Sequence, residues 1–202
     1  MNRLMPLITI LTLAASIPLT AAAEVTEYPI DPTHSQVVFS VRHILANVPG
    51  RFDKFEGSVW VDPKNIEKSL RVEGSVQMAS VNTNNEKRDE HLRGPDFFDA
   101  ENHPELTFES KSAKKKGDKY VLTGDLTMRG VTKSVDFEVV IHGFAENPFT
   151  KTPMTALDMT GTIDRQEFGV SFSKTLETGS LLVGNDVTLT INLEATVPPE
   201  QS

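Results

Sequence analysis

The sequence predicts an all-β fold of about eight antiparallel strands closed into a barrel, with one short helix. Three observations lead to this prediction. Apolar and polar residues alternate along many segments, as in strands that bury one face. Pairs of turn-forming residues, such as Asp62-Pro63 and Gly117-Asp118, separate these segments. The chain has no repeat, linker or low-complexity stretch, which indicates a single domain.

The strand signal is clearest near the two ends of this domain. Val37, Phe39, Val41 and His43 share one face of the first strand, and alternation of the same kind returns from Val187 onward. The expected strands cover residues 37–43, 57–61, 71–79, 106–110, 120–128, 135–142, 155–163 and 187–194.

An antiparallel sheet of this size can hide its edges as a two-layer sandwich, or as a barrel wide enough for one small ligand. The chain contains 11 Phe but only 1 Trp and 2 Tyr, and most of the Phe residues lie at inward or turn-edge positions. This composition favours the barrel, although alternation by itself fits either arrangement.

Residues 1–23 have the composition of a secretory signal peptide. Arg3 is the one charged residue, an apolar stretch follows it, and three alanines at 21–23 suit cleavage. Pro6 and Pro18 bracket a run shorter than the roughly 20 apolar residues of a membrane-spanning helix. We therefore expect cleavage after residue 23 and a single domain over 24–202. The expected location is the periplasm, with secretion as the alternative.

Charge and cysteine content exclude several classes of function. The chain has 28 acidic and 20 basic residues, a net charge of -8, and loss of Arg3 with the signal peptide would make it more acidic. Such a charge disfavours nucleic acid and permits at most transient contact with anionic membranes. The chain has no Cys, so disulfides, thiolate metal ligands and a cysteine nucleophile are absent.

The segment 87–108, KRDEHLRGPDFFDAENHPELTF, concentrates histidine and charged residues around two adjacent Phe residues. Thr83 and Glu86 have the spacing of a capping box, and Gly94-Pro95 is typical of a helix end. They predict a helix over about 84–93, followed by a helical turn near 96–100. Within the helix, Asp89 and Arg93 have the i,i+4 spacing of an ion pair.

This segment has no pattern that is specific for a metal or for catalysis. His91 and His103 belong to neither a HExxH nor a His-x-His motif, and the chain has no G-x-S-x-G elbow. We interpret the segment as a lid whose two Phe residues face the interior, with no metal site and no catalytic residues; the alternatives are a polar contact with the head group of a ligand and, after that, metal binding or catalysis. We interpret His43 as a core residue and His34 as a hydrogen-bonding residue of a turn.

An ordered set of residues spans most of the chain. Its members are Asp31-Pro32, His34-Ser35, Phe39, His43, Gly50, Phe52, Phe55, Gly57, Arg88-Asp89, His91-Leu92, Asp96-Phe97-Phe98-Asp99, His103-Pro104, Phe108, the run GDLTMRGVTK over 124–133, Asp164-Arg165 and Phe168-Gly169. In this order and spacing the set resembles the YceI-like family of polyisoprenoid-binding periplasmic proteins, from about residue 28 to residue 197. Asp164 stands where the family usually has Asn, and Ser134 where Pro is frequent.

The resemblance implies a lipocalin-like barrel whose apolar tunnel holds an isoprenoid lipid, with no catalytic residues and no cofactor. It also implies that a homodimer can form. By resemblance, the tunnel is lined by Phe39, Val41, Phe52, Phe55, Phe97, Phe98, Phe108, Leu126 and Phe168. Strand phase adds Val76, Met78 and Met128.

The sequence leaves three kinds of function open. The first is a carrier or store for a polyprenyl or quinone-type lipid, or for a fatty acid or fatty amide. The second is an enzyme that acts on a lipid and uses His91, Asp89 or His43 as acid or base. The third is a structural protein whose barrel is filled by its own side chains.

Overall fold

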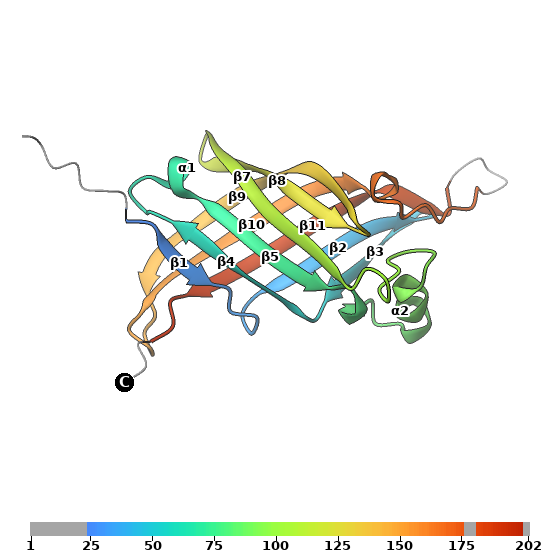
Figure 1. Ribbon diagram of the computed structural model, residues 1–202, viewed down its shortest axis with the longest axis horizontal. Helices are drawn as coiled ribbons and strands as arrows, with labels where there is room; N and C mark the ends of the chain where they lie inside the picture. Colours follow the sequence, from blue (N-terminus) through green and yellow to red (C-terminus); the bar gives the residue numbers. More distant parts are fainter. Residues whose placement is uncertain (1–23, 176–180, 200–202) are drawn as a thin grey trace, which may run out of the picture.

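The all-β prediction is confirmed by the computed structural model, which describes residues 24–175 and 181–199. Eleven strands form one antiparallel sheet in the order β1-β4-β5-β7-β8-β9-β10-β11-β2-β3-β6 (Figure 1). They are β1 (Thr26–Pro29), β2 (Gln36–His43), β3 (Ala46–Phe52), β4 (Phe55–Val61), β5 (Arg71–Gln77), β6 (Val81–Asn82), β7 (Glu105–Lys116), β8 (Lys119–Met128), β9 (Val131–Glu146), β10 (Pro153–Asp164) and β11 (Val183–Thr196).

The predicted number of eight strands is wrong because three of the eleven strands were missed. Strands β1 and β2 flank the turn at 31–35, and β3 and β4 flank residues 53–54. Since β1 pairs with β4 and β2 pairs with β3, these four strands are the two arms of one interrupted hairpin. The sequence prediction missed β1, β3 and the two-residue β6. Pro49 and Gly50 hid β3, because neither residue favours a strand.

The sheet curls until the end of β1 meets β11, the last strand of the chain. Just after β1, Ile30 forms an isolated antiparallel bridge with Ala195 of β11. The Asp31 amide donates a hydrogen bond to the Glu194 carbonyl at 2.8 Å. Because of these contacts, the curled sheet encloses a space that its inner face lines.

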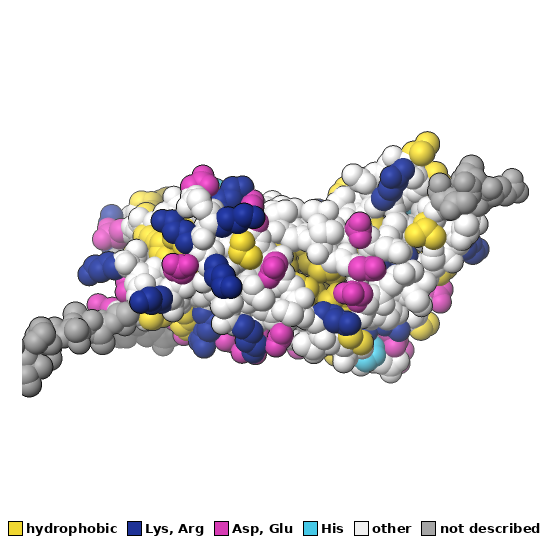
Figure 2. Space-filling model, turned by 90° about the horizontal axis from the view of Figure 1, so that it is seen from above, with side chains coloured by type: hydrophobic (Ala, Val, Ile, Leu, Met, Phe, Trp, Pro, Cys, Tyr) yellow, Lys and Arg dark blue, Asp and Glu magenta, His cyan; other side chains and the backbone are white. Residues whose placement is uncertain are grey.

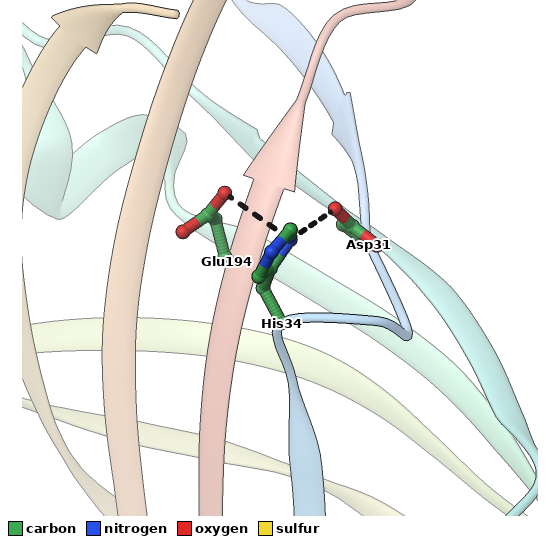
Figure 3. A group of neighbouring side chains, drawn as sticks. All are labelled: Asp31, His34 and Glu194. Carbon is green, nitrogen blue, oxygen red and sulfur yellow. Dashed lines mark hydrogen bonds and ion pairs between the residues drawn. The ribbon is translucent and has the colours of Figure 1, made fainter.

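Asp31, His34 and Glu194 form a side-chain clamp at this junction (Figure 3). His34 Nδ1 lies 2.8 Å from Asp31 Oδ2 and 3.9 Å from Glu194 Oε1. The prediction of His34 as a hydrogen-bonding turn residue is confirmed. The hydrogen bond that His34 donates to Asp31 raises the pKa of His34, and the same bond lowers the pKa of Asp31.

Replacing His34 with Gln is expected to flatten the pH dependence of stability near neutrality. A raised pKa in the folded state means that protonated His34 stabilises the fold. That contribution is complete below the ordinary value of 6.5 and is lost as the pH rises through the folded pKa. Urea unfolding of both proteins across this range measures the difference. If the free energy of unfolding changes with pH equally in wild type and variant, the clamp has no stabilising charge interaction.

The helices are short, and the longest in the described residues is α2 (Glu86–Arg93). It lies near the end of the sheet opposite β1 (Figure 1). The predicted helix is confirmed but begins at Glu86, and the capping box is wrong. The cap is Asn85, whose side chain accepts from the Arg88 amide, while Thr83 turns inward to Asp89.

Two further expectations for this region need correction. Arg93 pairs with Glu86, at 3.1 Å, and not with Asp89, because Asp89 is buried against Thr83. The segment near 96–100 contains hydrogen-bonded turns, with the Phe97 and Asp99 amides donating to the Gly94 carbonyl. The structure adds α1 (Ile66–Ser69) and two 3₁₀ turns, η1 (Met78–Ser80) and η2 (Arg165–Phe168).

The apolar interior divides into two clusters. One includes Val59, Leu122 and Phe137, and the other gathers Phe39, Phe52 and Phe97 with residues of β5, β8 and η2. Acidic and basic side chains are spread over the outer face in Figure 2, with hydrophobic side chains grouped in a hollow near its middle. In the residues that the structure describes, no helix has the length and apolar character to cross a membrane.

Candidate functional site

Three cavities follow one another inside the curled sheet, and we name them inner, middle and outer. The inner cavity has a volume of about 80 Å³, the middle one about 70 Å³ and the outer one about 280 Å³. Inner and middle cavities share Phe52, Leu106 and Leu189 as lining residues. Middle and outer cavities share Phe39, Val41, Leu92, Phe97 and Val183. The shared walls place the three in series, and we call this row of cavities, narrowed or closed at two walls of side chains, the tunnel.

The lining of the middle cavity is apolar except for Arg165. The inner cavity is also mainly apolar: Glu56 and Glu73 border it beside Gly74, but Glu56 is exposed and Glu73 pairs with the exposed Arg71 at 3.5 Å. Small apolar cavities of this kind exclude water and accept apolar groups. Sites for drug-sized ligands usually have about 300–1,000 Å³, so a lipid tail requires side chains to move aside. The constrictions contain rotatable Phe rings, including Phe39 and Phe52, whose centroids lie 5.5 Å apart.

The structure places ten of the twelve expected lining residues at these cavities. Phe39, Val41, Phe52, Phe97, Phe98 and Met128 line the middle cavity. Phe55, Val76, Phe108 and Leu126, together with Phe52, line the inner one. Met78 and Phe168 line none of the three, because both are packed into the surrounding core with 1% of their surface exposed.

Several lining residues were missed by the sequence prediction. Val187 and Leu189 lie on the face of β11 that alternation had identified as buried, so their signal was present. Leu92 belongs to α2, and Ile163 to the end of β10. Arg165 belongs to the ordered family set, but nothing placed it at a cavity, since an arginine in a turn is normally exposed.

Arg165 is 4% exposed and its guanidinium is held by backbone carbonyls. Nε donates to the Gly184 carbonyl at 2.8 Å, Nη1 to Val170 at 2.6 Å and Nη2 to Val183 at 3.2 Å. Burial lowers the pKa of Arg165, although the group remains charged at any physiological pH. Arg165 therefore joins η2 to the beginning of β11 and fixes this wall of the tunnel.

The outer cavity is lined by both apolar and polar side chains. Its polar residues are His43, Thr83, Arg88 and His91. The ring of His91 packs edge-on against Phe97 and Phe172, with centroids 5.0 and 5.2 Å away. The interpretation of His43 as a core residue is wrong, because β2 ends there and its side chain is exposed. His43, Arg88 and His91 thus form an exposed polar mouth to an apolar tunnel.

The structure separates the three residues of the enzyme hypothesis. His43 and His91 line the outer cavity, but Asp89 does not. The Asp89 carboxylate is 4% exposed and accepts hydrogen bonds from the amide and hydroxyl of Thr83. Asp89 therefore anchors the start of α2, and it is not placed to exchange protons with a ligand.

One cluster in the described part of the chain has the side chains of a metal site. The candidate ligand atoms of Asp31, His34 and Glu194 lie within 4.8 Å of one another. The cluster is largely exposed, and His34 Nδ1 already bonds to Asp31. The arrangement of these three side chains is explained by the clamp that joins the start of the sheet to β11.

Comparisons with known proteins agree with this architecture. A UPF0312 protein of Staphylococcus aureus is 34% identical over 173 residues, which cover 85% of this chain and 98% of the relative. The crystal structure of Burkholderia cenocepacia BcnA matches with a TM-score of 0.73 and 25% identity, over 83% of this chain and 99% of the other.

Two further solved structures share the fold. The Campylobacter jejuni YCEI protein matches with a TM-score of 0.67 and 29% identity, over 78% of this chain and 90% of that one. A polyisoprenoid binding domain from Saccharophagus degradans matches with a TM-score of 0.58 at 16% identity, over 85% of this chain and 98% of that one. Residues 28–195 match the YceI-like domain, and the chain therefore belongs to that family.

Proposed function

We propose that this protein is a periplasmic carrier or store for an isoprenoid lipid, held in the tunnel of a lipocalin-like barrel. The observation that carries the proposal is the series of three adjoining cavities with predominantly apolar walls. Membership of the YceI-like family supports a lipid-binding role. The fold is also shared with the polyisoprenoid binding domain from Saccharophagus degradans.

The walls of the tunnel can supply the binding free energy without a strong polar contact. Burial of a methylene group contributes about 0.8 kcal/mol, so a five-carbon isoprene unit contributes on the order of 3–4 kcal/mol before association costs. A tail of a few units is then sufficient. We propose at most transient contact with membranes, and a homodimer as the assembly that the family resemblance implies.

The first test is native mass spectrometry of the mature protein from its own host, followed by organic extraction. We expect a mass excess of one lipid per chain and recovery of a polyprenyl or quinone-type species. A fatty acid or fatty amide in the extract would retain the carrier function and change the ligand. A chain without lipid that also takes up no added isoprenoid would indicate a barrel filled by its own side chains.

A matched pair of variants makes this test specific to the tunnel. Phe98 lines the middle cavity, whereas Phe149 is 92% exposed. Phe98→Arg is expected to abolish lipid retention, because a charged group in a dry cavity costs several kcal/mol. Phe149→Arg introduces the same side chain at the surface and should leave the bound lipid in place. Equal loss of lipid in both variants would contradict a site inside the tunnel.

A further inference from the structure

The outer cavity differs from the inner one in having basic side chains at its wall. Its ionisable lining residues are His43, Arg88 and His91, and none of its lining residues in the described part of the chain is acidic. This is unusual in a chain with 28 acidic and 20 basic residues. The inner cavity is lined mainly by apolar side chains and, among the described residues, offers no basic group. A negatively charged group is therefore favoured at the outer end of the tunnel and finds no basic partner in the described lining of the inner end.

Arg88 is held in a fixed orientation at this outer end. Its Nε donates to Thr83 Oγ1 at 2.7 Å and its Nη2 to the Thr83 carbonyl at 2.7 Å. Thr83 is anchored in turn, because its amide donates to the buried carboxylate of Asp89 at 2.9 Å. A guanidinium has five N–H donors. Within residues 24–175 and 181–199, no acceptor bonds to Nη1, which leaves donors for a ligand.

Two imidazoles complete the polar mouth. His91 Nε2 lies 3.1 Å from Asp96, and its ring is fixed between Phe97 and Phe172. His43 stands at the end of β2 and makes no side-chain hydrogen bond to another described residue. Each ring can donate to a ligand oxygen in the appropriate protonation state. Together with a pre-oriented guanidinium, they are suited to an oxyanion.

We propose that the outer cavity binds the head group of the lipid and that this head group is an oxyanion, a phosphate or carboxylate on a single apolar chain. The inference rests on the proposed lipid-binding function and specifies its ligand. The outer cavity shares Leu92, Phe97 and Val183 with the middle one, so a chain attached to the head group leads directly into the tunnel. The tail enters first and its free end lies in the inner cavity, whose lining is mainly apolar.

The test compares two probes with the same tail, geranylgeranyl phosphate and geranylgeraniol, by calorimetry on the delipidated full-length mature protein. We expect the phosphate to bind about tenfold more tightly, as charge-assisted hydrogen bonds at a fixed guanidinium allow. In Arg88→Gln, and further in Arg88→Gln/His43→Gln, the ratio of the two affinities should fall toward one. Lys114→Gln removes one positive charge from the exposed end of β7 and should keep the wild-type ratio.

The outcomes separate this inference from the carrier function. If the wild-type protein binds both probes equally, the oxyanion site is wrong and the carrier function stands. If it binds neither probe, the carrier function fails as well. An unchanged ratio in the Arg88 variants would also overturn the assignment. Inorganic phosphate serves as the third probe, and binding as tight as that of the lipid phosphate would show a site for a free anion instead of a lipid head group.

Discussion

Arg165→Met is expected to lower the free energy of unfolding by about 3 kcal/mol, since each buried acceptor left without a partner costs about 1–3 kcal/mol. Three backbone carbonyls, those of Val170, Val183 and Gly184, lose their donor in this variant. Methionine replaces the aliphatic stem of the side chain and its apolar contacts, so the loss mainly reports the guanidinium. In a thermal melt the same change corresponds to a decrease of roughly 10 °C.

Arg165→Lys is the control for charge. Lysine keeps a positive charge but has one compact ammonium group, which cannot reach three carbonyls with the geometry of a guanidinium. We therefore expect it to recover only part of the loss. If the free energy of unfolding of Arg165→Met lies within about 1 kcal/mol of the wild-type value, the three carbonyls find water or other donors. Arg165 then does not hold this wall together.

Gly50→Ala is expected to weaken lipid binding by about tenfold or more, equivalent to about 1.4 kcal/mol. Gly50 pairs with Phe39 across β2 and β3, and the Phe39 ring lies flat over it. A Cβ at Gly50 would approach Phe39 Cζ to 2.2 Å, so the ring must move away from the wall and into the tunnel. Phe39 lines both the middle and the outer cavities, and its displacement narrows the constriction between them.

The double variant Gly50→Ala/Phe39→Leu provides the rescue. Leucine is smaller than the ring, so the added methyl group no longer forces a side chain into the tunnel, and lipid uptake should return. Binding can be followed by the fraction of lipid-loaded protein in native mass spectra. If Gly50→Ala weakens binding and the double variant does not restore it, the effect arises from the strand and not from the ring.

The sequence prediction was accurate for strands whose own residue pattern shows which face is buried. It was less accurate where a residue is explained by its contact with a neighbouring strand. The predicted strand 37–43 agrees closely with β2, because regular alternation reports a buried face directly, and the less regular runs 120–128 and 155–163 also agree with β8 and β10. Strand β3 was missed because of Gly50. That glycine is explained by the Phe39 ring on the neighbouring strand, and such a pairing is visible only once the register is known.

In the candidate site, too, residues were predicted correctly where the pattern within one strand was sufficient, and were missed where contacts between distant parts of the chain decide their place. Apolar residues on identified strand faces, such as Phe39 and Leu126, reach the cavities as expected. Arg165 was missed because its partners are carbonyls of residues 170, 183 and 184, and backbone groups leave no mark in a sequence. Thr83 fits a capping box by spacing, but a buried carboxylate at Asp89 captures its hydroxyl.

The two constrictions along the tunnel make lipid binding depend on the length of the tail. A short tail can stop before the wall formed by Phe52, Leu106 and Leu189, whereas a longer one must displace these side chains before it gains further burial. Affinity is then expected to rise with chain length in steps, one for each compartment filled. Because every compartment that is filled must also be emptied, the residence time of the lipid lengthens at the same steps.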